Sequence, residues 1–162
     1  MAKPGTPAAM LERIRSIRLE QEVGDILQAN TDLLVEFQKK QMMQGKNNKG
    51  VLFSPLHSEN PWFKKPGAGL RYAGWKARKF PETPFDVPNF IITGYYHGSL
   101  SFSVSAGNVV ADASASFAKN IDQEFNNSVL GLNDDSKRTV WTDVVREPLV
   151  HVLADKIGCD VV

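Results

Sequence analysis

The chain has 162 residues, of which 42% are hydrophobic and 23% are charged, and its formal net charge is +1. This composition is typical of one globular domain and excludes a disordered or strongly basic protein. The single cysteine, Cys159, excludes an internal disulfide. No apolar run reaches the roughly 18 residues that a membrane-spanning helix needs, so we expect a soluble protein without a membrane partner.

The charges are unevenly distributed along the chain. Residues 1–36 carry a net charge of −2, residues 37–81 a net charge of +9, and residues 82–162 a net charge of −6. Such asymmetry indicates where partners bind rather than which fold forms. The basic middle segment is therefore the first place to expect a partner.

Two helices are predicted after a flexible arm at residues 1–7. The first has apolar residues at helical spacing, namely Met10, Ile14 and Ile17. Gly24 is expected to break it. Asp25 is the predicted N-cap of the second, long helix, because its carboxylate can accept the free amides of the first turn. Gly45 is the predicted C-cap of this second helix. Residues 8–162 as a whole are expected to form a single domain.

A long basic-aromatic loop is predicted at about residues 54–83. Residues 54–69 hold three of the nine prolines, which disfavour regular structure. Within the loop, Leu70–Phe80 has the pattern of a short helix with Leu70, Ala73 and Ala77 on one side.

The clearest strand signal is Leu100–Ser105, where apolar and hydroxyl residues alternate as in a half-buried strand. Residues 109–116 alternate in the same way after a turn at Ala106–Asn108, which predicts a β-hairpin. Asn89–Thr93 is expected to add a third antiparallel strand. The long N-terminal helix packed on this sheet, with flanking helices and a C-terminal helix, gives an α+β fold.

Helical spacing returns after the hairpin, at Phe117, Ile121 and Phe125. The polar run Asn133–Ser136 offers an N-cap for a C-terminal helix, which Gly158 is expected to end. Pro148 lies inside this last pattern. It must kink the helix or sit in the first turn of another one.

The residue types that carry catalysis or bind metals are scattered. His57, His97 and His151 lie far apart, and none has a metal-ligand spacing. Cys159 has no histidine near it in the sequence, which favours a structural role over a nucleophilic one. We therefore expect no enzyme activity, no cofactor, no metal and no small-molecule substrate. A less favoured hypothesis is an enzyme of unrecognised type that uses His97 and the neighbouring Tyr95 and Tyr96.

The segment from Asn60 to Pro81 alternates cationic and aromatic residues and has no acidic residue. Aromatic residues and arginine anchor protein interfaces, whereas cations with stacking rings bind single-stranded nucleic acids. A solvated face is the bland alternative. We favour a subunit or partner contact, made by Trp62, Phe63, Lys64, Lys65, Arg71, Tyr72, Trp75, Lys76, Arg78, Lys79 and Phe80. The alternative function is a small nucleic-acid-binding protein that uses residues 60–80.

Three short stretches share their order and spacing with a known family. The first is a helix that runs into Gln41-Met42-Met43-Gln44-Gly45-Lys46 and then Gly50. The second opens the hairpin and contains Thr93, Gly94, Tyr95, Tyr96, Gly98, Leu100, Phe102 and Val104. The third runs from Phe117 to Leu132, before the capped terminal helix. Together they resemble the tailed-bacteriophage head–tail connector family, whose members are also called neck or tail-completion proteins.

The resemblance implies an α+β subunit of a ring in the neck or tail of a virion, made in the host bacterial cytoplasm and without a cofactor. The implied partners are further copies of the chain, other phage neck and tail proteins and, in the ring lumen, DNA. Subunits in a ring contact one another through two different patches. We expect a basic patch at Lys64–Phe80 and an acidic one at Asp122–Asp143. The insert between Phe53 and Pro84 departs from the family pattern and leaves the position in the assembly open.

Overall fold

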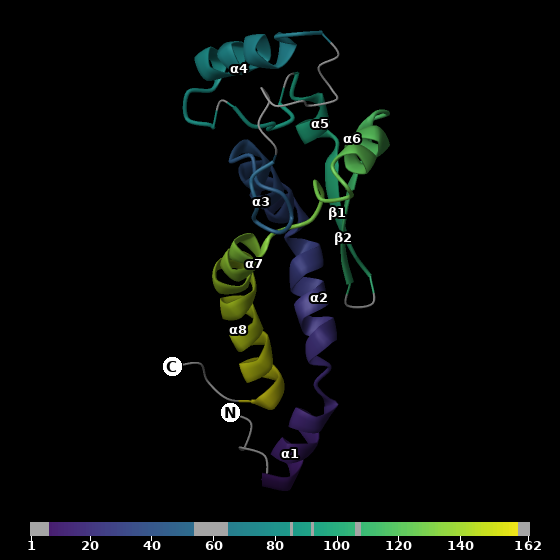
Figure 1. The fold of residues 1–162 in the computed structure, drawn as a ribbon. Helices are drawn as coiled ribbons and strands as arrows, with labels where there is room; N and C mark the ends of the chain where they lie inside the picture. Colours follow the sequence, from purple (N-terminus) through teal and green to yellow (C-terminus); the bar gives the residue numbers. More distant parts are fainter. Residues whose placement is uncertain (1–6, 54–64, 85, 92, 106–107, 159–162) are drawn as a thin grey trace. The chain divides into compact units, whose positions relative to one another are not determined.

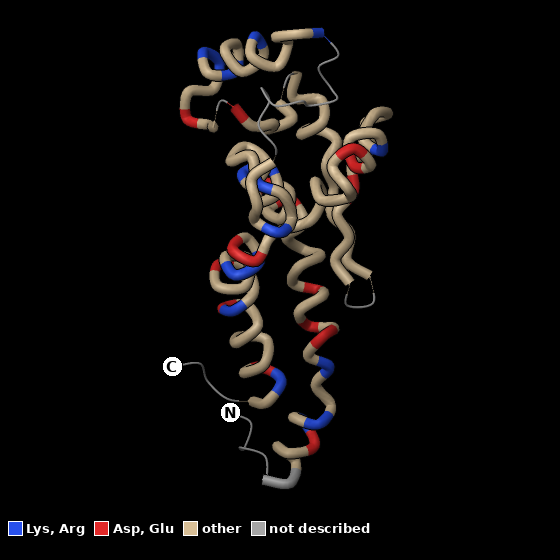
Figure 2. Tube along the Cα trace, viewed as in Figure 1, with Lys and Arg blue, Asp and Glu red and all other residues tan. Residues whose placement is uncertain are grey.

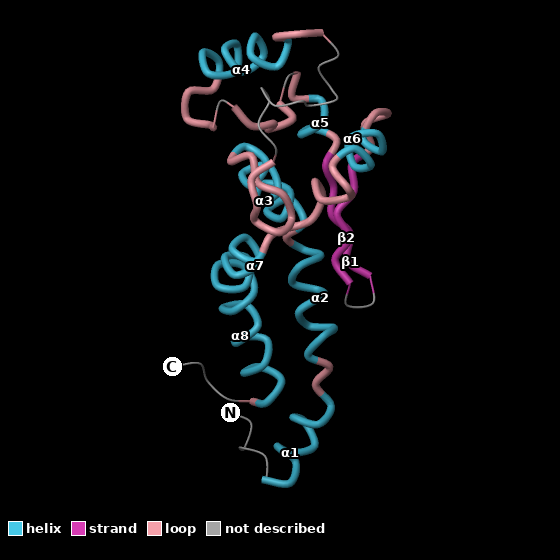
Figure 3. Tube along the Cα trace, viewed as in Figure 1, coloured by secondary structure: helices cyan, strands magenta, loops and turns pink. Residues whose placement is uncertain are grey.

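The computed structural model describes residues 7–53, 65–84, 86–91, 93–105 and 108–158 (Figure 1). The predicted arm at residues 1–7 lies outside these ranges except for Pro7, which begins the first helix. The described residues are mostly helical and contain a two-stranded antiparallel sheet (Figure 3), which confirms the α+β fold. None of their helices has the length and apolar character needed to cross a membrane.

The described residues group into two compact units. The helical unit comprises those within Met1–Thr31, Ser103–Val110 and Arg138–Val162. The central unit comprises those within Asp32–Phe102 and Ala111–Lys137. The central unit therefore contains the three stretches that resemble the connector family, apart from the part of the hairpin beyond Phe102. We call them the connector-like stretches.

The helical unit is built from α1 (Pro7–Ser16), α2 (Leu19–Ala29) and α8 (Arg146–Ile157). α1 and α2 both pack on α8. Lys156 of α8 forms an ion pair with Glu22 of α2, and Arg13 of α1 donates a hydrogen bond to the Ile157 carbonyl oxygen at 3.4 Å. The two ends of the described chain are thus held together by packing and by polar contacts.

The prediction that Gly24 breaks the first helix is wrong. The chain leaves the helical conformation at Ile17–Arg18 and again at Asn30, whose side-chain amide donates to a carbonyl oxygen of α2 at 2.8 Å. Gly24 lies inside α2, where an added Cβ atom would come within 3.7 Å of the Val104 side chain. That distance is an ordinary van der Waals contact, so the site has room for a side-chain methyl group. Asp25 follows Gly24 inside α2 instead of capping a helix.

The C-terminal helical segment is continuous but not uniform. It consists of α7 (Asp134–Val140), a π turn (Trp141–Val145) and α8. Asn133 caps it, since its side-chain oxygen accepts the Ser136 N–H at 2.9 Å. Pro148 lies in the first turn of α8, which is the second of the two positions expected for it. The π turn just before it keeps the chain helical, and Gly158 ends α8 in a left-handed conformation, as predicted.

Besides the start of α7, the described residues of the central unit form α3 (Thr31–Met43), α4 (Ala68–Lys79), α5 (Tyr95–Gly98) and α6 (Ala118–Glu124). Gly45 ends α3 as predicted, with φ of +70°. The Gly45 N–H bonds to the Met42 carbonyl oxygen at 2.8 Å, and the Lys46 N–H bonds to that of Gln41 at 3.2 Å. This pair of bonds is a Schellman motif.

Helix α4 occupies the place of the predicted short helix inside the long loop. Ala73 is buried there, as expected, whereas Leu70 is 61% exposed and does not share its face. The loop predicted at about 54–83 is therefore helical over much of its described part.

The predicted hairpin is confirmed, and the predicted third strand is wrong. β1 (Leu100–Ser105) pairs with β2 (Asn108–Ala113), and Leu100 and Phe102 are buried while Val104 is half-buried. The described residues of Asn89–Thr93 form no strand. Phe90 has φ of +57°, a left-handed conformation that an extended strand does not contain.

The core of the central unit is partly aromatic. Its buried members are Met42, Phe53, Tyr96, Leu100, Ala113, Ala115, Ala118, Ile121 and Val129. The rings of Phe53, Phe90 and Phe125 meet edge to face, each pair with centroids 5.2 Å apart. Such contacts stabilise beyond the burial of area and offset the strain of the Phe90 backbone.

Candidate partner-binding surface

Two buried glutamines on α3 join the first and third connector-like stretches. The Gln38 side chain donates to the Val129 carbonyl oxygen at 3.1 Å and accepts the Gly131 N–H at 2.9 Å. One turn later, Gln41 donates to the Gly131 carbonyl oxygen at 3.0 Å and accepts the Asn133 N–H at 2.8 Å. We call this arrangement the glutamine clamp. It satisfies main-chain groups that would otherwise be buried without a partner.

The second stretch forms α5 and then enters β1. The Thr93 hydroxyl accepts the Tyr95 N–H at 3.3 Å, and Gly94 turns the chain with φ of +76°. Tyr96 is buried in the core, whereas its neighbour Tyr95 is 57% exposed. The stretch thus places one tyrosine of the pair inside and the other outside.

His97 is buried and bonded to the main chain. Its Nε2 atom donates to the Asn89 carbonyl oxygen at 2.8 Å, which fixes the tautomer. Burial lowers the pKa of His97, and the Asn89 carbonyl opposes this only in part. These contacts give His97 a structural role. Within the described ranges, no three histidine, cysteine, aspartate or glutamate side chains gather as a metal site would require.

The aromatic residues of α4 pack on one another. Tyr72 stacks on Trp75 with centroids 5.7 Å apart, and Trp75 meets Phe80 edge to face at 6.1 Å. All three side chains are half-buried, and burial raises the pKa of Tyr72 to about 12. The predicted contact residues Trp62, Phe63 and Lys64 lie outside the described residues.

Lys76 differs from the surface position that the sequence led us to expect. Its side chain is 0% exposed, and its ammonium group donates to the Val87 carbonyl oxygen. Burial lowers the pKa of Lys76 to about 8, and the charge of Asp86 opposes this only in part. Lys76 therefore ties α4 to the segment after it and is not available to a partner. The sequence did not indicate this, because lysines of a basic helix are ordinarily solvated.

We expect the free energy of unfolding to rise between about pH 8 and pH 10. The folded protein releases the Lys76 proton near pH 8, whereas the unfolded chain holds it up to the ordinary value of 10.5. The unfolded state therefore binds more protons in this window, and a rise in pH favours the folded state by about 2 kcal/mol. Above about pH 10 the trend reverses, because the raised pKa values of Tyr72 and Tyr96 let the unfolded chain ionise its tyrosines first.

Urea titrations at a series of pH values measure this profile. The variant Lys76→Met is the control, since it keeps an unbranched side chain only one atom shorter and removes the titrating group. It should lose the rise between pH 8 and pH 10 and keep the fall above it. A wild-type profile without the rise would contradict the buried position of Lys76.

Several Lys and Arg residues lie along α4 (Figure 2), and most of them are exposed. Arg71 and Arg78 are two turns apart and exposed, and Lys79 is exposed beside them. Gly74 lies between the two arginines, and a Cβ atom added there would meet no atom within 4 Å. No acidic residue occurs from Lys65 to Lys79. This basic face of α4, made by Arg71, Gly74, Arg78 and Lys79, is suited to a partner with carboxylates or phosphates.

No family model, curated protein or solved structure matches the chain. Its function is therefore inferred from its own residues.

Gly74→Ala should raise the free energy of unfolding by up to about 1 kcal/mol. Alanine favours the helical conformation over glycine by about this amount, and the added methyl group enters open space. Chemical denaturation of the isolated protein measures the change. A loss of stability would show that the basic face is packed against another part of the same chain.

The sequence did not single out Phe117 as a contact residue, and it placed Tyr95 only among the fold residues. Phe117 is 39% exposed and Tyr95 57% exposed, and their ring centroids lie 5.8 Å apart. The sequence feature that could have indicated an exposed ring is the Tyr95-Tyr96 doublet, because two consecutive side chains point in different directions and only one ring can enter the same core. The other ring is left at the surface.

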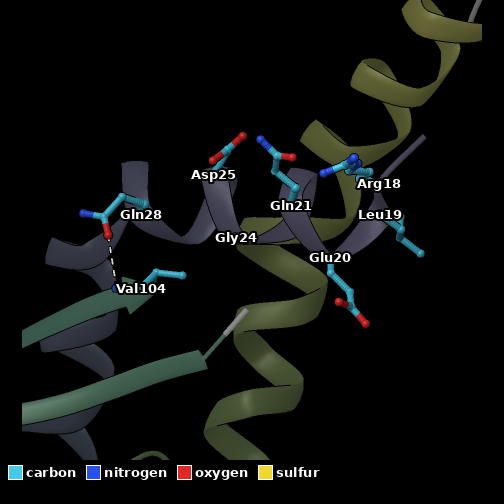
Figure 4. A pocket seen from close by; sticks show the side chains of 8 residues that line it. All are labelled: Arg18, Leu19, Glu20, Gln21, Gly24, Asp25, Gln28 and Val104. Carbon is cyan, nitrogen blue, oxygen red and sulfur yellow. Dashed lines mark hydrogen bonds between the residues drawn. The ribbon is translucent and has the colours of Figure 1, made fainter. Parts of the chain in front are cut away.

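The helical unit contains an open cleft beside α2 (Figure 4). It is lined by Arg18, Leu19, Glu20, Gln21, Gly24, Asp25, Gln28 and Val104. The Gln28 side-chain oxygen accepts the Val104 N–H at 3.1 Å, so a polar group of the β1 edge is already satisfied. The cleft mixes charges of both signs and offers general polar contacts rather than a defined chemistry.

Proposed function

We propose that the protein is a structural subunit of a ring at a phage head–tail junction, in a neck, connector or tail-completion position. It acts by protein–protein assembly. In this proposal the chain is made in the host bacterial cytoplasm and is incorporated into the virion. Its partners are further copies of itself and other phage neck and tail proteins, with DNA passing through the ring.

The main support is that the three connector-like stretches pack into one core. Met42 comes from the first stretch, Tyr96 and Leu100 from the second, and Ile121 and Val129 from the third. The glutamine clamp joins the first and third stretches by directed hydrogen bonds. A resemblance at short separate stretches gains weight when those stretches meet, because together they determine one fold.

The surface of α4 adds support for a role in binding. Arginine and aromatic residues are enriched at protein interfaces, and α4 carries both. Its exposed arginines stand beside a half-buried, rigidly stacked pair of rings, Tyr72 and Trp75. Rings that are already held in place lose little freedom when a partner covers them.

The alternative is a small nucleic-acid-binding protein that uses residues 60–80. The exposed cations Arg71, Arg78 and Lys79, without an acidic neighbour on α4, favour it. The stacking of Tyr72 on Trp75 argues against this alternative, because a ring that stacks on a base needs a free face and each of these rings already has one face covered.

Light scattering on the purified protein, alone and with its virion partners, tests the proposal. We expect a discrete oligomer whose mass stays constant over a range of concentrations and changes little with moderate salt. A monomeric mass in every mixture would contradict a ring subunit. DNA retention that falls steeply with salt, without any oligomer, would favour the alternative.

A further inference from the structure

The α5–α6 side of the central unit presents two exposed rings that are rigidly held. Tyr95 and Phe117 contact each other with centroids 5.8 Å apart, and Phe117 also stacks on the buried ring of Tyr96 at 6.2 Å. The two rings together form one continuous apolar surface rather than two isolated exposed residues. An aromatic pair fixed from below has the character of an interface anchor.

Two carboxylates accompany these rings. Asp112 is exposed on β2, and Asp122 lies on α6 with its Oδ1 atom buried and without a hydrogen-bond partner. The hydroxyl of Tyr96, a residue only 3% exposed, is also unpartnered. Both polar atoms lie close under the exposed rings, so the apolar surface of this face is backed by acceptor groups.

The charges of this cluster act on one another. Burial raises the pKa of Tyr96, and the charges of Asp122 and Asp112 add to the effect. Burial also raises the pKa of Asp122; the Leu130 main chain opposes this, and the charge of Asp112 adds to it. A positive charge placed at the two carboxylates would relieve their repulsion. We call Tyr95, Phe117, Asp112 and Asp122 the acceptor face.

The basic face of α4 carries groups that fit this acceptor face. An arginine guanidinium pairs with carboxylates and also stacks on aromatic rings. Arg71 and Arg78 are exposed for both contacts, and the open position at Gly74 lets a ring approach the helix between them. Chemically, the two faces are complementary.

The two faces are made by different elements of the central unit. The basic face belongs to α4, and the acceptor face to α5, β2 and α6 with its N-cap. Two different patches on one copy are what head-to-tail assembly requires.

We propose that the basic face of α4 in one copy docks on the acceptor face of a second copy. The inference rests on the proposed function, because it identifies the contact that would join neighbouring subunits. It differs from the acidic patch expected at Asp122–Asp143, since Asp143 belongs to the helical unit. In the docked state the arginines lie against Asp112 and Asp122, and the rings of Tyr95 and Phe117 lie against the helix.

Two complementary variants test this contact. The donor variant, Arg71→Glu with Arg78→Glu, keeps its acceptor face intact. The acceptor variant, Tyr95→Ser with Asp112→Asn, keeps its basic face intact. Each variant alone should self-associate at least about 30-fold more weakly than the wild type, as expected for the loss of hot-spot residues. Their equimolar mixture should form a heterodimer that grows no further, because only one working face of each kind is present.

Matched controls separate this contact from changes in net charge or surface polarity. Lys40→Glu with Lys49→Glu changes the charge as much as the donor variant does, at exposed positions outside both faces. Leu52→Ser with Asp32→Asn is the match for the acceptor variant, again at exposed positions. Both controls should assemble like the wild type, and far-ultraviolet circular dichroism of every variant reports whether it folds.

The outcomes distinguish this contact from the proposed function as a whole. A wild type that never assembles contradicts both. A wild type that assembles, with either variant assembling equally well or with no heterodimer in the mixture, contradicts the contact alone. A donor variant that assembles normally but no longer retains DNA would assign the basic face of α4 to a nucleic acid instead.

Discussion

Replacing Gln41 with leucine should lower the free energy of unfolding by about 3–5 kcal/mol. The change removes the side chain that pairs with the Gly131 carbonyl oxygen and the Asn133 N–H. A polar group left buried without a partner costs about 1–3 kcal/mol, and two main-chain groups are affected. Leucine has nearly the volume of glutamine, so the loss reflects hydrogen bonding rather than a cavity.

Chemical denaturation measures the effect, with Gln44→Leu as the matched control. Gln44 is exposed one turn further along, so the same chemical change there should alter stability by no more than about 0.5 kcal/mol. The double variant Gln38→Leu with Gln41→Leu should lose less than the sum of the two single losses, because both glutamines serve the same segment. A loss below about 1 kcal/mol for Gln41→Leu would show that water replaces the clamp.

Gly45→Ala should lower the free energy of unfolding by about 2–5 kcal/mol. The residue has φ of +70°, and holding a non-glycine residue there costs about 1–3 kcal/mol. The added Cβ atom would also overlap the Val87 side chain, which is buried, and overpacking costs a further 1–3 kcal/mol or so. The two costs have separate causes and add.

The same substitution at Gly74 provides the control for Gly45. Both changes add one methyl group to a glycine of the central unit, yet we expect opposite signs, because Gly74 has open space and a helical backbone. Equal effects at the two positions in a denaturant titration would refute the account of Gly45.

Features that depend on neighbouring residues in the chain were predictable. The alternation of Leu100–Ser105 determines which side of a strand is apolar, and the buried Leu100 and Phe102 follow it. Asn133 and the glycines Gly45 and Gly158 act as caps through contacts with residues only a few positions away. Such signals are complete within a short window of sequence.

Features that depend on distant residues were not predictable. Gly24 looks like a helix breaker, yet it lies inside α2, which packs on the distant α8. Asn89–Thr93 looks like a strand until the aromatic cluster holds Phe90 in a left-handed conformation. The glutamine clamp joins residues about 90 positions apart. Hydrogen bonds of this kind leave no periodic signal, and two glutamines in a buried helix face are the only hint.

The candidate surface was predictable as a segment but not residue by residue. Composition alone identified the basic-aromatic stretch, yet it did not divide the buried Lys76 from the exposed Arg71 and Arg78. The acceptor face was not predicted, because Asp112, Asp122 and Phe117 form no motif and no periodic pattern in the sequence. That Trp62 and Phe63 contact a partner stays a prediction.

The π turn at Trp141–Val145 has a consequence for how this sequence tolerates change in length. A π turn is an α-helix that has accepted one additional residue, so deleting one residue here should restore a regular helix without unfolding it. Because the wider turn absorbs the additional residue, the residues beyond the deletion would keep nearly the same orientation about the helix axis, and the buried Leu149 would keep its place. A deletion inside the regular part of α8 has no such turn to absorb it and would rotate every following residue by about 100°. The π turn is therefore the one described place in this helical segment where the sequence should tolerate the loss of a residue.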